Sequence, residues 1–256
     1  MKKKITICLA LVLTVVLAIS VLTACSLFGG DNKTNNNNNQ NGNETKTLTS
    51  SECSSELSSA INTSLKKSNY SIKIVGSRSE EMSSYVTTIE HDANTLHYIF
   101  NWKKDSSDGN DENNKLYVES YYFVNDGNYY SSVRDSESED FRTSTSLKAT
   151  FDTYVASRSL KAIINGYKLN DNAEITYEGT KKGTESSITT TTVATVEGVK
   201  TELKTFITIK NGLIVSASQS TTTYNSGDVG TEIERKEITI KYDTATVELA
   251  AGIRIA

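Results

Sequence analysis

Proline is absent from this chain of 256 residues, and histidine and cysteine are scarce, with two and three residues. Without proline, tight turns must use Gly, Asn and Asp, which tolerate the backbone angles that such turns need. So few histidines and cysteines leave little material for zinc, which usually takes four nitrogen or sulfur ligands in a structural site. No Gly-x-Ser-x-Gly, phosphate-loop or dinucleotide-binding motif is present either. We therefore expect no metal, no other cofactor and no enzymatic activity.

The N-terminus combines charge, a long apolar run and small residues. Lys2–Lys4 are followed by the apolar run Ile5–Leu22 and then by Thr23-Ala24-Cys25. This order predicts a secretory signal peptide over residues 1–24. Leu22-Thr23-Ala24-Cys25 resembles the bacterial lipobox, in which an aliphatic residue and two small residues precede an invariant cysteine. The resemblance implies a lipoprotein whose mature chain begins at Cys25, with diacylglycerol on its sulfur and fatty acids such as palmitate as the anchor.

An uncut membrane anchor is the alternative, because about 18 apolar residues are just enough to span a bilayer. The run ends at Cys25 itself, and no charged residue follows before Asp31, which favours the cleaved lipoprotein. Two acyl chains then hold the chain on the membrane. We expect it on the outer face of the cytoplasmic membrane, and a composition rich in Lys, Asn, Ser and Thr indicates a Gram-positive-type cell.

The remaining chain is acidic and begins with a polar tract. Without the lysines of the signal, 24 basic residues face 31 acidic ones, a net charge of −7. This balance disfavours nucleic-acid partners and electrostatic binding to anionic lipid. Asp31–Glu44 contains no apolar residue, so residues 25–47 are predicted to be a disordered linker. A single folded domain is expected over residues 48–256.

Periodicity predicts two helical regions and a series of strands in that domain. Apolar residues at helical spacing indicate a helix over Ser51–Lys67 and a second helical region over Thr145–Asn165. Alternation or short apolar runs predict strands over residues 70–75, 85–89, 96–102, 116–124, 128–133, 173–178, 187–196, 200–210, 213–224, 232–242 and 246–249. This order predicts an α+β fold, a curved, half-barrel-like antiparallel sheet with the N-terminal helix and the mid-chain helices on one face.

The same order of elements is similar to the superfamily of lipoprotein carriers and glycolipid-binding lipoproteins. The points of similarity are the helix Ser51–Lys67 leading into Tyr70–Val75, the aromatic meander Leu96–Val133, the mid-chain helices, and the closing strand that ends in Ile240-Lys241-Tyr242. The resemblance implies a half-barrel with helices in its concavity, and a lipid as ligand.

Aromatic residues supply the candidate ligand site. Tyr98, Phe100 and Trp102 alternate on one face of a predicted strand, and Tyr122 belongs to a tyrosine-rich stretch nearby. Two interpretations remain open. The residues form the core beneath the helices, or an unfilled part of the sheet leaves them as a concave apolar site for a lipid or another amphiphile.

Other candidate chemistry is weaker. His91 and His97 flank a predicted turn and lack a third ligand. Ser64-Leu65-Lys66-Lys67 matches the Ser-x-x-Lys motif of penicillin-recognising enzymes, but its partner motifs are missing. The acidic loop Asp105–Glu112 does not fit a calcium-loop register. Cys53, at the start of the predicted helix, is expected to be partly exposed and dispensable.

Two functions follow as hypotheses. The first is a membrane-anchored lipoprotein that binds a lipid or amphiphile on the apolar face of its sheet. The second is a surface-display or interaction lipoprotein with a filled core, whose exposed Ser and Thr faces meet a protein or a glycan. The sequence leaves the oligomeric state open.

Replacing Cys25 with Ala tests the lipoprotein prediction. Without the thiol that carries the lipid, the variant is expected to be released into the medium or to remain an unprocessed precursor. Membrane fractionation and the mass of the mature protein measure this. Unchanged partitioning together with an unchanged mature mass would refute the prediction.

Overall fold

The structure is a computed structural model, and it describes residues 44–92, 94–104, 114–167, 173–196, 198–224 and 229–255. Residues 1–44 and Thr45–Ala256 are separate units. The signal peptide, Cys25, most of the linker and the acidic loop at 105–112 therefore lie outside the described residues. Within the described part, no helix is long and apolar enough to cross a membrane.

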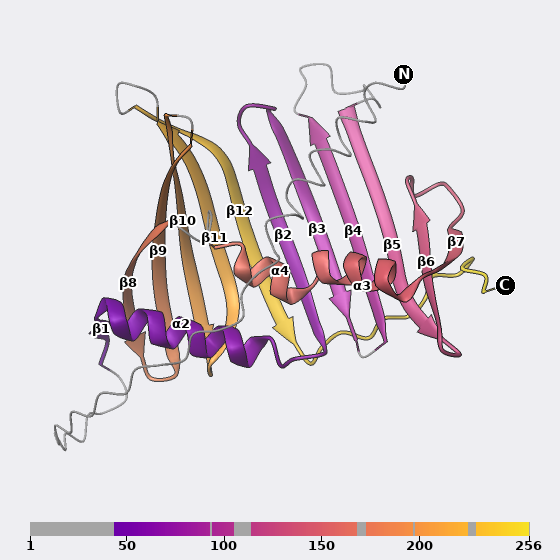
Figure 1. The fold of residues 1–256 in the computed structure, drawn as a ribbon, viewed down its shortest axis with the longest axis horizontal. Coiled ribbons are helices and arrows are strands. Elements are labelled where there is room, and N and C mark those ends of the chain that lie inside the picture. The colour runs from indigo at the N-terminus through magenta and orange to yellow at the C-terminus, as the bar shows by residue number, and fades with distance from the viewer. Residues whose placement is uncertain are drawn as a thin grey trace. The chain divides into compact units, whose positions relative to one another are not determined.

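One open antiparallel sheet of twelve strands makes up most of the folded unit, and three helices lie on it (Figure 1). The strand order is β1-β8-β9-β10-β11-β12-β2-β3-β4-β5-β6-β7, so β1 and β7 are the edges. The strands of the N-terminal half are β1 (Lys46–Leu48), β2 (Tyr70–Arg78), β3 (Ser83–His91), β4 (Thr95–Lys104), β5 (Lys115–Asn125), β6 (Asn128–Arg134) and β7 (Arg142–Ser146). Those of the C-terminal half are β8 (Glu174–Lys182), β9 (Glu185–Val196), β10 (Val199–Lys210), β11 (Leu213–Tyr224) and β12 (Gly230–Tyr242).

The connections explain why the helices share one face. Strands β2–β7 form one meander and β8–β12 another, and the two meet where β12 pairs with β2. The chain must therefore return from edge strand β7 to β8 near the opposite edge. Helices α3 (Lys148–Ser157) and α4 (Leu160–Asn165) make part of that crossing, while α2 (Ser50–Ser64) links edge strand β1 to β2. Below, the face that bears these helices is the helix face, and the opposite one is the outer face.

Helix α2 begins one residue before the predicted start and ends three residues before the predicted end. Its N-cap is Thr49, whose hydroxyl accepts a hydrogen bond from the backbone N–H of Glu52. The carboxylate of Glu52 in turn accepts one from the Thr49 backbone N–H, which completes a capping box. The edge strand β1 precedes the cap, so Lys46 and Thr47 belong to the sheet rather than to the linker.

The mid-chain helical region is divided in two. Ser159 has an extended backbone, and its hydroxyl accepts a hydrogen bond from the backbone N–H of Ala162. This new N-cap ends α3 and starts α4, because an N-cap residue lies outside helical geometry. Phe151, Leu160 and Ile164 of these helices are buried in the main core.

The main core lies between the helices and the helix face of the sheet. It joins Cys53, Leu57 and Ala60 of α2 to inward-facing residues of most strands, among them Ile72 and Ile240. A second, smaller core lies on the outer face. There the side chains of Tyr121, Phe123 and Tyr130 pack with Phe141 and with three residues of the C-terminal segment, Val247, Ala250 and Ile253.

The strand predicted at 246–249 is wrong, since residues 244–250 have no regular secondary structure. Individual hydrogen bonds hold the segment in place instead. The Asn69 side chain exchanges two hydrogen bonds with the backbone of Ala245, and the backbone N–H of Val247 donates to Asp92. Apolar residues of the segment then cover the outer-face core.

The expectation that Cys53 is partly exposed is also wrong, because none of its surface is accessible. The residue occupies the buried stripe of α2, and a Cβ added at Gly179 of β8 would lie 2.9 Å from its sulfur. Burial raises the pKa of the Cys53 thiol. The helix therefore presents this residue to the sheet rather than to the solvent.

We accordingly expect Cys53→Ser to lower the free energy of unfolding by about 1–3 kcal/mol, the cost of burying a hydroxyl without a suitable partner. For a unit of this size that is a loss of roughly 2–4 °C in Tm per kcal/mol. Thermal melts under reducing conditions measure it, with Ser58→Ala on the exposed face of α2 as control. A Cys53→Ser melt equal to that of the parent would contradict the buried position.

Candidate functional site

The helix face of β4 and β5 changes from buried to open along the strands. Leu96 and its cross-strand partner Tyr122 are almost fully buried, and the Tyr122 ring lies 6.5 Å from that of Phe151 in α3. At the other end, Trp102 pairs with Leu116, and Leu116 is 48% exposed. Figure 1 shows α3 and α4 crossing the sheet part-way along its strands, so that β2–β5 extend beyond the helices. The helices therefore cover only part of this face.

The predicted aromatic residues lie on both sides of that boundary. Tyr98, Phe100, Trp102 and Tyr122 all face the helix side, as the alternation predicts. Tyr122 belongs to the filled core, whereas Phe100 and Trp102 are only partly buried. The neighbour of Tyr122, Tyr121, packs in the outer-face core instead. Strand alternation makes this unavoidable, since adjacent residues point to opposite faces.

Tyr85 on β3 lies at the edge of this apolar surface, and the residue itself is only 8% exposed, with the guanidinium carbon of Arg78 at 5.6 Å from the ring centroid. The Tyr85 ring lies over Gly76, where a Cβ would come within 2.3 Å of the ring carbon Cζ. Only glycine lets the ring lie this close to β2. The centroids of the Tyr85 and Phe100 rings are 6.1 Å apart. We call Tyr85, Phe100, Trp102 and Leu116 the aromatic floor.

Charged side chains border the aromatic floor on the β2 and β12 side. The Glu234 carboxylate accepts hydrogen bonds from Arg78 at 3.3 Å and from the Tyr85 hydroxyl at 3.1 Å, and it lies 2.8 Å from the Lys236 ammonium. Burial alone would raise the pKa of Glu234, but Lys236, Tyr85 and Arg78 together lower it. The carboxylate therefore stays ionised, and it compensates both cations.

Arg158 borders the aromatic floor at the boundary with the helices. It is the C-cap residue of α3, and its guanidinium carbon lies 4.7, 5.4 and 5.6 Å from the ring centroids of Tyr98, Tyr122 and Tyr154. A cation over an aromatic ring gains about 0.5–1 kcal/mol where exposed and about 2 where desolvated. Burial raises the pKa of Tyr98, and the charge of Arg158 opposes that rise. The Arg158 Nε is buried and lacks a hydrogen-bond partner.

Beneath the helices the main core is filled. A cavity of about 20 Å³ separates α4 from β10–β12. That is room for about one water molecule, whereas ligand sites usually measure roughly 300–1,000 Å³. The cavity is lined by Ile163, Ile164, Tyr167, Thr205, Ile207, Ile214, Ala217, Gln219, Ile238 and Ile240. An acyl chain therefore does not fit there unless α4 moves.

A larger hollow, of about 420 Å³, lies on the surface beside α2, β1 and β8. Its charged groups are already paired, Lys46 with Glu52 at 2.5 Å and Lys181 with Glu56 at 2.9 Å. The other lining residues are Leu48, Ser51, Ser55 and Ser59. A polar, ion-paired surface of this kind offers little to an apolar ligand.

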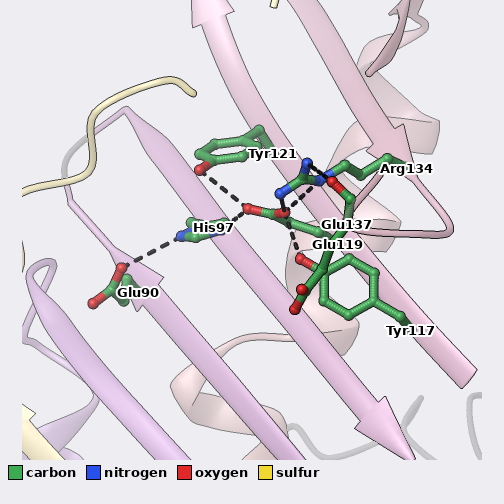
Figure 2. A network of polar contacts seen from close by, with 7 residues as sticks. All are labelled: Glu90, His97, Tyr117, Glu119, Tyr121, Arg134 and Glu137. Atoms are coloured by element: carbon green, nitrogen blue, oxygen red, sulfur yellow. Dashed lines mark hydrogen bonds and ion pairs between the residues drawn. The ribbon is translucent and has the colours of Figure 1, made fainter. Parts of the chain in front are cut away.

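The outer face holds a polar network that the sequence did not reveal (Figure 2). The Glu119 side chain, with 5% of the residue exposed, accepts hydrogen bonds from Tyr117 at 2.6 Å and from Arg134 Nε at 2.7 Å. His97 Nε2 lies 2.9 Å from the same carboxylate, and the Tyr121 hydroxyl donates to it at 3.4 Å. The network thus fixes β4, β5 and β6 to one another.

The pKa values follow from this arrangement. Burial alone would raise the pKa of Glu119, but the hydrogen bonds from Tyr117, His97 and Arg134 together lower it. Burial and the charge of Glu119 raise the pKa of Tyr121 to about 12, and burial and the hydrogen bond to Glu119 raise that of Tyr117 to about 12. The phenols therefore remain donors at neutral pH, and every partner of the carboxylate is structural.

The histidines do not form a pair. The His91 ring stacks on Tyr70 at 5.0 Å, and its Nδ1–H donates to the carbonyl of Ser68, whereas His97 lies on the outer face between Glu90 and Glu119. Among the residues that the structure describes, no three His, Cys, Asp or Glu side chains are grouped as a metal site requires.

Ser64 and Lys67 also have separate partners. The buried Ser64 hydroxyl accepts a hydrogen bond from the backbone N–H of Ile214 at 3.1 Å. The Lys67 ammonium pairs with Asp243 at 2.6 Å. A lysine that activates a serine must contact its hydroxyl, so this geometry gives the Ser-x-x-Lys match a structural explanation.

Comparison with known proteins adds no relative. No protein-family model matches the chain, and no curated protein sequence matches it.

Glu119→Gln is expected to lower the free energy of unfolding by about 3 kcal/mol at pH 7, because it removes the buried carboxylate that pairs with the Arg134 guanidinium. The loss should shrink on acidification. A lowered folded-state pKa stabilises above the unfolded value of about 4.3, and this contribution disappears as pH falls through the folded pKa.

Denaturant unfolding of both forms between pH 7 and pH 3 measures the effect. Glu185→Gln, which removes an exposed pair with Lys210, is the control and should cost less than about 1 kcal/mol. A Glu119→Gln loss that is as small as the control, or that does not change with pH, would contradict the account.

Proposed function

We propose that this chain is a membrane-anchored lipoprotein, held through lipid on Cys25 at the outer face of the cytoplasmic membrane, whose folded unit binds an amphiphile without enzymatic chemistry. The observation that supports it best is the aromatic floor. Tyr85, Phe100, Trp102 and Leu116 continue the apolar helix face along β3, β4 and β5, and Leu116 is 48% exposed. An apolar surface of this kind next to charged side chains matches the two parts of an amphiphile.

The apolar chain and the polar head of such a ligand would contact different parts of this surface. An acyl chain laid on the aromatic floor would gain about 0.8 kcal/mol for each buried CH₂ group. The polar head would remain within reach of the charged border that Arg158, Arg78 and Lys236 form. The filled core under α4 excludes the chain from the interior, so the ligand would lie on the sheet rather than inside it.

The arrangement of the elements supports the finer fold that the proposal needs. We infer that the sheet curves toward its helices as a half-barrel, with the aromatic floor on the concave side. One core, formed by residues of α2, α3, α4 and most strands, agrees with such wrapping. The predicted linker would let the domain lie near the membrane surface, since residues 26–45, between the cysteine and β1, have a typical reach of roughly 25 Å.

An interaction role on the outer face is the second candidate. Six hydroxyl side chains stand opposite one another across six neighbouring strands, Thr47, Thr180, Ser187, Thr208, Ser216 and Thr239. In the next row Phe206 is 47% exposed, between Thr189 and Ser218. Hydroxyls around an exposed ring fit a neutral glycan. This observation favours the display function over a purely structural outer face.

Leu116→Glu tests the first proposal in the unit Thr45–Ala256, which contains both cores and the only tryptophan of the chain, Trp102. We expect oleate to change Trp102 emission saturably in the parent. The added carboxylate should weaken this binding about tenfold or more, because a charge would be buried against the acyl chain.

Val75→Glu is the matched control, because Val75 is 44% exposed on the outer face. Its oleate affinity should stay within about twofold of the parent. A parent without a saturable response, or an equal loss in both variants, would sink the proposal. Retention of that same protein on an insoluble glycan would then favour the second candidate.

A further inference from the structure

Arg158 stands apart from the arginines of the sheet in its lack of an anion. Arg78, Arg134, Arg142 and Arg235 each pair with at least one carboxylate. Within the described part of the chain, Arg158 has no ion pair, and its polar contacts are to the Tyr154 carbonyl and the Ser157 hydroxyl. A partly buried guanidinium without a counter-ion is costly.

The position of the guanidinium is fixed although its charge is not compensated. Three rings surround it, those of Tyr98 on β4, Tyr122 on β5 and Tyr154 on α3. Stacking on aromatic faces holds the planar group and leaves its edge free to donate hydrogen bonds. Nε is a buried donor with no acceptor in the protein. The charge of the guanidinium therefore has no counter-ion among the described residues, although Nε itself is closed to solvent.

On β4, the aromatic floor begins next to Arg158. Tyr98 and Phe100 are successive helix-face residues of β4, so Arg158 stands at the inner end of the aromatic floor. The filled core closes the side toward Leu96 and Tyr122. An anionic group at Arg158 would thus be joined to whatever lies on Phe100 and Trp102.

We propose that Arg158 is the head-group residue of the site, and that the ligand is an anionic amphiphile whose carboxylate or phosphate binds the guanidinium while its chain lies on the aromatic floor. This inference rests on the proposed function and deepens it by naming the ligand class. The cations at the other border, Arg78 and Lys236, share Glu234 and so attract an anion less. Arg158 would therefore separate anionic from neutral amphiphiles.

The test compares two ligands with the same chain, oleate and monoolein, on the unit Thr45–Ala256 and its Arg158→Gln variant. Wild type is expected to bind oleate more tightly than monoolein. Arg158→Gln should weaken oleate binding about tenfold to 100-fold, the worth of a charge-assisted hydrogen bond, and leave monoolein within about twofold. Arg158→Lys keeps the charge but loses the planar, forked set of donors, so its oleate affinity should lie between those of wild type and Arg158→Gln.

Arg235→Gln is the control, because Arg235 pairs with Glu232 on an exposed part of the sheet. Circular dichroism melts establish that each variant is folded. Equal oleate affinity in wild type and Arg158→Gln, or an equal loss for both ligands, would overturn the assignment while the proposed function stands. Binding of neither ligand to wild type would overturn both. A competition with sodium phosphate distinguishes a free anion from an amphiphile. If phosphate displaces oleate at concentrations equal to that of oleate, and does so only when Arg158 is present, the residue binds a free anion and the assignment of an amphiphilic ligand is overturned.

Discussion

The antiparallel pairing of β2 with β12 is the contact on which the rest of the fold depends. It joins the first strand of one meander to the last strand of the other, and it places Ile72 beside Ile240 and Ile74 beside Ile238 in the main core. Because these strands sit at the centre of the sheet, the chain between the meanders must travel from one edge to the other. That crossing places α3 and α4 on a single face and leaves the outer face to the C-terminal segment.

The short length of the crossing helices leaves part of the helix face uncovered. Helix α3, of ten residues, packs on β4 and β5 near Tyr122, and α4, of six residues, packs on β10–β12. The remaining helix face is apolar for the same reason that the core is, since both continue one alternating pattern. The surface that we propose for ligand binding lies where this alternating apolar pattern continues beyond the helices.

Periodicity predicted most of the strands and the two helical regions, because each depends on neighbours in sequence. The pairing of β2 with β12 could not be predicted, since it joins residues separated by more than 150 positions. The face of Cys53 was predicted wrongly as well. Cys53 precedes Leu57 by four residues and so belongs to the buried stripe of the helix, a spacing that outweighs its place in the first turn.

The polar sites could not be predicted from the sequence for the same reason, because their residues are distant in sequence. Glu119 lies in a strand of mixed residues, and its donors Arg134, His97 and Tyr117 come from three strands, so no local pattern marks the network. Alternation did place Tyr98, Phe100 and Trp102 on one face. Arg158 carried no signal, because its tyrosine partners become neighbours only when α3 packs on β4 and β5.

Photo-crosslinking with a diazirine-bearing fatty acid tests the central claim most directly, because it reports where an amphiphile lies. The account predicts saturable labelling, prevented by excess oleate, in peptides that contain Phe100, Trp102 or Leu116. Labelling that does not saturate, or that falls mainly on the outer face around Val75 and Phe206, would contradict it.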